Sequence, residues 1–154
     1  MKDGLGTYYH KNGDKFEGCY RSSLREGFGI YLHKNRDRYE GNYVQGKKCG
    51  QGEYFYASGD KFSGNYKDDK KHGKGSYVYA SGTTFVGEYL NDKKSGYGIY
   101  TSKDGDSYEG QYLDGHKHGY GKARFAATGS YEGEFLNGET HGQGIFKFLN
   151  GEEY

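Results

Sequence analysis

Hydrophobic positions along the chain are mostly aromatic, and they alternate with other residues at a spacing of two. The clearest unit is aromatic-x-Gly-x-aromatic, as at 108–112, which places two rings and a glycine on one face of an extended strand. A second run follows each unit, in which a G-x-G pair leads into alternating residues such as Ser76-Tyr77-Val78-Tyr79. Both halves therefore predict β-strands rather than helices.

Both units recur every 23 residues. The G-x-G pairs begin at Gly4, Gly27, Gly50, Gly73, Gly96, Gly119 and Gly142, and the aromatic units begin at Phe16, Tyr39, Phe62, Phe85, Tyr108 and Tyr131, with Tyr154 opening a seventh copy. A fixed period of this size is typical of stacked repeats. Turn sequences such as VQGKKC within a copy and ASGD between copies make each copy a β-hairpin.

Chained hairpins predict an all-β protein, namely an elongated single-layer antiparallel meander of stacked β-hairpins with a 23-residue period. Strands about 4.8 Å apart, two to a copy, would advance the array by about 10 Å per repeat and give a rod of about 60–70 Å. The 29 glycines and 28 aromatic residues (19 Tyr and 9 Phe) indicate how it is held together. We expect rings to cover bare glycine backbone on adjacent strands, in place of a central core.

Composition and charge exclude several classes of protein. A net charge of +1 argues against nucleic acid as a partner, because neutralising phosphates needs clustered basic residues. The sequence contains neither an apolar run of 18 residues nor a signal-peptide core. Cys19 and Cys49 occupy different repeat positions, which favours reduced thiols in a cytoplasmic protein.

Catalysis is not expected, because an active site needs unlike residues converging on one spot and a uniform repeat supplies like residues in rows. No nucleotide-binding, metalloprotease or nucleophile motif is present, and no cofactor is expected. His72, His118 and His141 share one repeat position, yet copies about 10 Å apart cannot place them around one metal ion. We therefore expect no metal site.

The unit Tyr108-Glu109-Gly110-Gln111-Tyr112, followed by Asp114-Gly115-His116-Lys117-His118-Gly119-Tyr120-Gly121, resembles the MORN repeat (membrane occupation and recognition nexus). The resemblance covers the whole chain, as a single array over 1–154 of about six and a half repeats, which we expect to be a fragment of a longer chain. One departure is systematic, since Tyr or Phe fills the Trp position of the family at Tyr20, Tyr43, Tyr66, Tyr89, Tyr112 and Phe135.

The resemblance implies a non-enzymatic scaffold that organises cytoskeletal or ciliary partners. Its aromatic face would form a groove for an extended or helical protein segment. Self-packing of the same rings is the competing interpretation, and both can hold together. The expected groove residues are Tyr43, Tyr54, Tyr66, Tyr77, Tyr89, Tyr100, Tyr112 and Phe135.

A second hypothesis is recruitment to an anionic membrane or a phosphoinositide, in service of a kinase elsewhere in a longer chain. Basic residues before each G-x-G pair would form an edge for anionic lipid or an acidic partner, although lysines in turns also keep a sheet soluble. This edge consists of Arg25, Lys47, Lys48, Lys70, Lys71, Lys93, Lys94 and Lys117. The protein would then lie in the cytoplasm, on the cytoskeleton or at a membrane surface, and open end strands allow end-to-end association.

Overall fold

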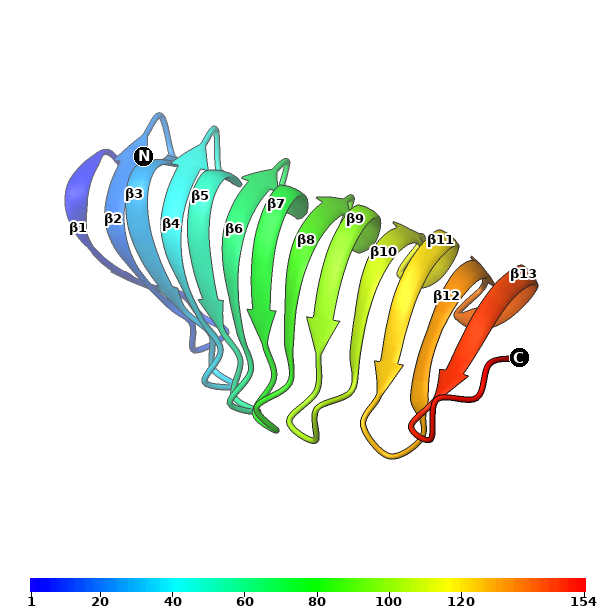
Figure 1. The fold of residues 1–154 in the computed structure, drawn as a ribbon. Helices are drawn as coiled ribbons and strands as arrows, with labels where there is room; N and C mark the ends of the chain where they lie inside the picture. The colour runs from blue at the N-terminus through cyan, green and yellow to red at the C-terminus, as the bar shows by residue number, and fades with distance from the viewer.

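The computed structural model describes residues 1–154 and contains β-strands with no helix. Thirteen strands form one antiparallel sheet in which each strand pairs only with its neighbours in sequence, from β1 to β13 (Figure 1). The expected single-layer meander of stacked hairpins is confirmed. No second layer covers either face, so both faces are available for other roles.

The strands fall into two sets. The even strands carry the aromatic units and are β2 (Lys15–Arg21), β4 (Arg38–Val44), β6 (Lys61–Lys67), β8 (Thr84–Leu90), β10 (Ser107–Leu113) and β12 (Gly129–Leu136). The odd strands carry the G-x-G pairs and are β1 (Gly4–Tyr9), β3 (Leu24–Leu32), β5 (Lys47–Phe55), β7 (Lys70–Val78), β9 (Lys93–Thr101), β11 (His116–Phe125) and β13 (Glu139–Phe148).

Tight two-residue turns connect each even strand to the odd strand that follows. Between β8 and β9 the turn is Asn91-Asp92, with φ of 48° and 71°. Positive φ at both residues belongs to the hairpin turn whose twist matches that of the strands, and Asn and Asp tolerate it better than most residues. The basic residues expected in these turns instead begin the odd strands, since β9 starts at Lys93.

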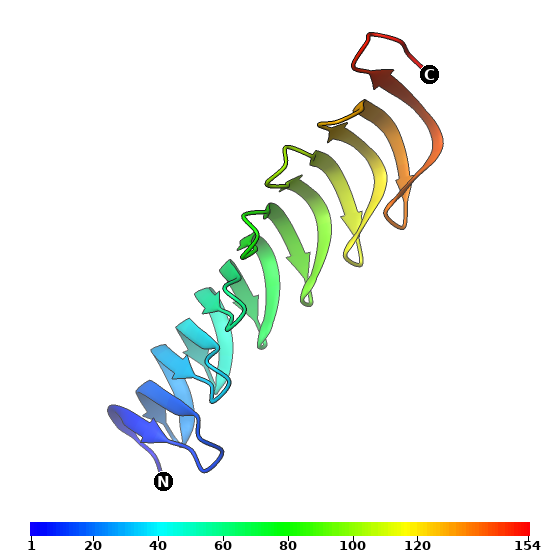
Figure 2. The same cartoon turned by 90° about the horizontal axis from the view of Figure 1, so that it is seen from below.

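A change of register bends each odd strand from β3 to β13. In the β8–β9 pair, Gly87 faces Gly98 while Tyr89 faces Lys94, so more residues are used on β9 than on β8. Gly96 lies within this irregularity with φ of 84°, a conformation that favours glycine. The strands therefore curve, as Figure 2 shows. We call the face on the inside of this curve the inner face and the opposite one the outer face.

The curvature is visible in side-chain contacts along one strand. Lys48 and Tyr54 lie near opposite ends of β5, yet the Lys48 Nζ is 4.9 Å from the centroid of the Tyr54 ring. A straight strand would separate residues six apart by about 20 Å. The inner face is therefore concave across the strands.

The rings pack on glycine, as expected. Phe62 has no exposed surface, and a Cβ added at Gly75 on the neighbouring strand would lie 2.5 Å from its Cε2 atom. Phe62 also meets Tyr66 and Tyr89 edge to face, at centroid distances of 5.5 and 5.2 Å. Each such ring thus links the second ring of its own copy to that of the next, which is consistent with the constant length of the repeat.

Hydrogen bonds between successive hairpin turns add a second link, which the sequence pattern did not predict. The Asp69 carboxylate accepts a hydrogen bond from the Lys48 backbone N–H at 2.8 Å, and Asp92 accepts one from the Lys71 N–H at 2.8 Å. At the far end, Tyr154 exchanges two backbone hydrogen bonds of 2.8 Å with Phe146 and so covers part of the β13 edge.

Candidate functional site: a groove on the outer face

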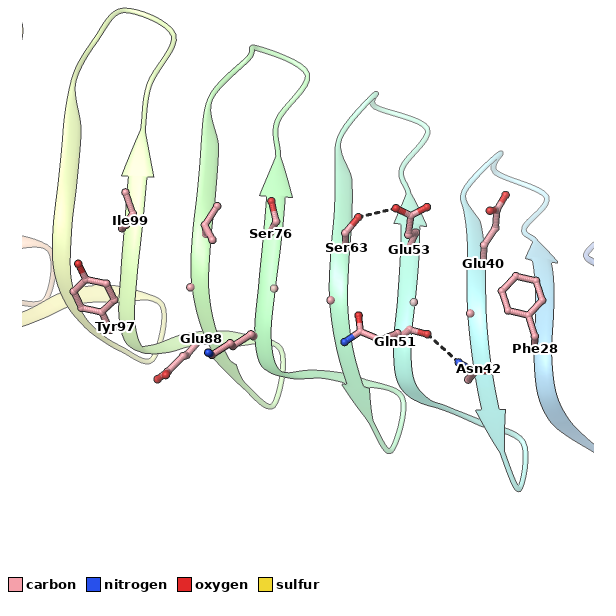
Figure 3. A pocket seen from close by; sticks show the side chains of 17 residues that line it. Phe28, Glu40, Asn42, Gln51, Glu53, Ser63, Ser76, Glu88, Tyr97 and Ile99 are labelled. Atoms are coloured by element: carbon pink, nitrogen blue, oxygen red, sulfur yellow. Dashed lines mark hydrogen bonds between the residues drawn. The ribbon is translucent and has the colours of Figure 1, made fainter.

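The outer face has a groove of about 770 Å³ that runs across the strands from β3 to β9 (Figure 3). Residues that alternate with the rings line it. They are Phe28, Glu40, Asn42, Gln51, Glu53, Ser63, Lys74, Ser76, Val86, Glu88, Tyr97 and Ile99, together with the glycines at 41, 52, 64, 75 and 87. The groove therefore crosses several repeats and is open along its length.

The glycines of the groove floor are the same ones that hold the rings of the inner face. A Cβ at Gly52 or Gly75 would point into the ring of Tyr39 or Phe62 on the inner face. The same glycines line the groove on the outer face. One set of glycines thus lets rings settle on the inner face, while the outward side of their backbone forms part of the groove floor.

The walls carry apolar side chains at positions outside the ring-and-glycine pattern of the repeat. Phe28, Val86, Tyr97 and Ile99 are 62%, 53%, 43% and 41% exposed. Val86 of β8 pairs with Ile99 of β9, which places two of them side by side. Most equivalent positions in other copies are polar, so this apolar surface is a local feature of the groove.

The polar wall residues form a network. Ser63 Oγ donates to Glu53 Oε1 at 3.0 Å, and Lys61 Nζ lies 2.8 Å from the same oxygen (Figure 3 shows the serine contact). These contacts, first that of Lys61, lower the pKa of Glu53. Gln51 Nε2 donates to Asn65 Oδ1 at 2.8 Å. With three glutamates and one lysine among the lining residues, the groove is acidic.

The expected partner-groove residues lie on the inner face, opposite this groove. Tyr43, Tyr66, Tyr89, Tyr112 and Phe135 are buried, with exposed fractions between 2% and 7%. Tyr54, Tyr77 and Tyr100 are half-buried and pack against that cluster. The buried rings pack against one another, while the half-buried ones keep part of their surface exposed. The outer groove was missed because a search for the recurring residues passes over the positions between them.

The expected basic edge divides into two sets. Lys47, Lys70 and Lys93 are exposed where the odd strands begin, and Lys47 Nζ lies 3.9 Å from Asp68. Arg25, Lys48, Lys71, Lys94 and Lys117 instead lie over the rings of the inner face. Burial lowers the pKa of Lys48, Lys71 and Lys117. Neighbouring residues in a strand point to opposite faces, so each pair of basic residues is split.

The histidine, cysteine and acidic side chains are not brought together into a second site. No group of three or more His, Cys, Asp or Glu side chains is arranged to hold a metal ion, and both thiols are free. The structure has no helix that is long and apolar enough to cross a membrane.

The fold is similar to that of a solved structure with low sequence identity. The SAS-4 (dCPAP) TCP domain of Drosophila melanogaster, solved in complex with a proline-rich motif of Ana2 (dSTIL), has a TM-score of 0.55 and 16% identity, over 99% of this chain and 83% of that one. No curated protein sequence matches the chain.

The MORN repeat pattern matches seven segments of the chain, at residues 1–15, 16–38, 39–61, 62–84, 85–107, 108–127 and 131–153. These segments follow the 23-residue period of the hairpins. The chain therefore belongs to the MORN repeat family, whose repeats indicate a protein-interaction or membrane-binding module.

Proposed function

We propose that this chain is a non-enzymatic scaffold whose outer groove holds an extended segment of a partner protein. The observation that carries the proposal is the groove itself, which combines glycine backbone with exposed apolar side chains and is not filled by the chain. Cytoskeletal or ciliary proteins in the cytoplasm are the partners that the family resemblance favours.

The dimensions of the groove suit a short peptide. It crosses from β3 to β9, which spans six inter-strand spacings, or about 29 Å at about 4.8 Å each. An extended chain rises about 3.3 Å per residue, so about nine residues fit along it. Val86 and Ile99 would contact apolar side chains, while Glu40, Glu53 and Glu88 favour a segment with basic residues.

The solved SAS-4 TCP domain supports a peptide as the class of ligand. That domain has a similar fold and holds a proline-rich motif of another protein. At 16% identity the two proteins share a fold, but their contact residues cannot be equated. The choice of the outer groove is therefore based on the residues of this chain.

Selection from a library of random peptides of about nine residues tests the proposal. Peptides enriched on the unaltered protein should bind the double variant Val86→Ser/Ile99→Ser at least about tenfold more weakly, equivalent to about 1.4 kcal/mol. The matched control is Leu90→Ser/Leu113→Ser, which removes two exposed apolar side chains that do not line the groove. Failure to enrich any peptide, or equal loss in both double variants, would refute the proposal.

The membrane hypothesis has less support from the arrangement of charge. Of the eight basic residues expected at one edge, five lie over rings on the concave inner face, which a flat bilayer does not enter. Three remain exposed at the hairpin ends, at Lys47, Lys70 and Lys93.

A further inference from the structure

The inner face carries a row of positive charges that make no direct ion pair, although Asp69, Asp92 and Asp106 lie in their neighbourhood. Arg25, Lys48, Lys71, Lys94 and Lys117 recur every 23 residues, and each lies over aromatic rings. Lys71 Nζ, for example, is 4.8 Å from the centroid of Phe62 and 5.0 Å from that of Tyr77. None of the five takes part in an ion pair. A partly desolvated charge is costly unless it is paired, so this row favours an anionic ligand.

Two buried hydroxyl groups on the same face also lack partners. Tyr66 and Tyr89 are 4% and 5% exposed, and neither hydroxyl makes a hydrogen bond. By contrast, the Tyr39 hydroxyl donates to the carbonyl of Asn42. Lys48 Nζ is 5.4 Å from the Tyr66 ring and Lys71 Nζ is 5.9 Å from the Tyr89 ring. Free hydroxyl donors thus lie beside unpaired ammonium groups, and both need acceptor oxygens.

A ladder of half-buried rings runs beside the row of cations. The centroids of Tyr54 and Tyr56 are 4.5 Å apart, those of Tyr56 and Tyr77 are 5.7 Å apart, and those of Tyr77 and Tyr79 are 4.5 Å apart. Lys94 Nζ donates to the Tyr79 hydroxyl at 3.2 Å and joins the two rows. Aromatic surfaces of this kind bind proline-rich segments in the polyproline II conformation.

The spacing of the row matches that conformation. Adjacent repeats are two strand spacings apart, about 9.6 Å. A polyproline II helix has three residues per turn and rises about 3.1 Å per residue, so every third side chain returns to the same side after about 9.3 Å. In a β-strand, by contrast, side chains three residues apart point to opposite sides. Carboxylates at every third residue of such a helix would meet successive cations.

We propose that the inner face binds an acidic, proline-containing segment of a partner protein in the polyproline II conformation, with a carboxylate at every third residue facing Lys48, Lys71 and Lys94. The ladder from Tyr54 to Tyr79 contacts the prolines between these carboxylates. This site lies on the face opposite the outer groove, so its existence does not depend on the function proposed for that groove.

Fluorescence anisotropy with two synthetic peptides tests the proposal. One peptide repeats Glu-Pro-Pro about five times, and the other has the same composition with all glutamates at one end. The first should bind at least about tenfold more tightly at low salt, and binding should weaken as salt is raised. Equal affinity of the two peptides, or no binding of either, would overturn the proposal.

Neighbouring residues provide matched variants. Lys71→Gln should weaken binding of the repeating peptide at least about fivefold. Lys70→Gln removes an exposed lysine that does not lie on the inner face, so it should leave peptide binding unchanged. Lys71→Arg keeps the charge and should retain binding, which separates loss of charge from misfolding. Equal losses in Lys70→Gln and Lys71→Gln would contradict a site on the inner face.

The unpartnered hydroxyl gives a second readout. Tyr89→Phe removes a buried donor that has no acceptor in the free protein, so its melting temperature should not fall, while binding of the repeating peptide should weaken a few-fold. The double variant Val86→Ser/Ile99→Ser on the outer face should bind this peptide normally. Unchanged peptide binding in Tyr89→Phe would overturn the proposal. So would a protein that binds neither peptide but floats on anionic vesicles in a way that requires Lys71.

Discussion

The Asp60 carboxylate accepts a hydrogen bond from the Tyr77 hydroxyl at 2.8 Å and another from the Ala80 backbone N–H at 2.8 Å. Asp60 precedes β6, whereas Ala80 belongs to the next turn between repeats, so one carboxylate joins successive turns. The same arrangement occurs at Asp14 with Tyr31 and at Asp37 with Tyr54, at 2.7 and 2.9 Å. The hydrogen bond from Tyr31, and then that from the Lys34 N–H, lower the pKa of Asp14.

Loss of one such carboxylate should destabilise the array. We expect Asp60→Ala to reduce the free energy of unfolding by about 1.5–3 kcal/mol, because hydrogen bonds to a charged acceptor are lost. Asp106→Ala is the matched control, since Ala123 occupies the tyrosine position of that copy and Asp106 accepts only the Ala126 N–H bond from the following turn. Denaturant unfolding should show a smaller loss for Asp106→Ala. Equal losses would mean that the tyrosine contact contributes nothing.

High pH should unfold the protein through its tyrosines. Burial raises the pKa of Tyr56 and Tyr108 to about 12, and burial with the Asp14 hydrogen bond does the same for Tyr31. These hydroxyls ionise near pH 10 in an unfolded chain, so the stability that they contribute is complete below about pH 10 and is lost as the pH rises toward about 12.

Three lysines with lowered pKa act in the opposite direction, because stability rises as each loses an unfavourable charge. That gain is complete by about pH 10.5, where lysines ionise in an unfolded chain, so it lies mostly below the range in which the tyrosines lose stability. The buried tyrosines outnumber them, so the free energy of unfolding should fall. Denaturant titrations at several pH values measure it, and tyrosinate absorbance should appear together with unfolding. Stability that is constant or rising above about pH 10 would disagree with buried, protonated rings.

Binding to anionic vesicles should be weak. Each exposed lysine near an anionic surface contributes about 1 kcal/mol to binding, and Asp68 beside Lys47 offsets part of that lysine's contribution. Flotation at low salt should therefore disappear at about 0.15 M salt, where the Debye length is about 8 Å. The measurement is a flotation series in rising salt. Flotation that persists at about 0.15 M salt and is lost in Lys70→Glu would favour the membrane hypothesis.

The 23-residue period predicted most of the fold because its key contacts recur. Phe62 with Gly64 and Gly75 is repeated at every copy, and a pattern of rings and glycines reports that packing directly. The links from Asp60 to Tyr77 and Ala80 also recur, in three copies, and a search for residue types that appear together every 23 positions would have found the aspartate and tyrosine.

The candidate site was harder to predict because it depends on curvature. The register change near Gly96 bends β9, and this bend decides which face closes over its own side chains. It also turns Lys94 over the Phe85 ring while Lys93 stays exposed. The open groove lies at positions where the residue type changes between copies, such as Val86, whose equivalents are Glu17, Glu40, Ser63, Glu109 and Glu132.

Unfolding of Gly75→Ala compared with Ser76→Ala tests most directly whether rings resting on glycine backbone hold the sheet together. The added Cβ at Gly75 would lie 2.5 Å from the Phe62 ring, so we expect the free energy of unfolding to fall by about 1–3 kcal/mol. Ser76→Ala alters the neighbouring outer-face residue and should change it by less than about 0.5 kcal/mol. If Gly75→Ala were as stable as the unaltered protein or more so, the added methyl group would act only by restricting the unfolded chain. Rings resting on glycine backbone would then not be what holds the sheet together.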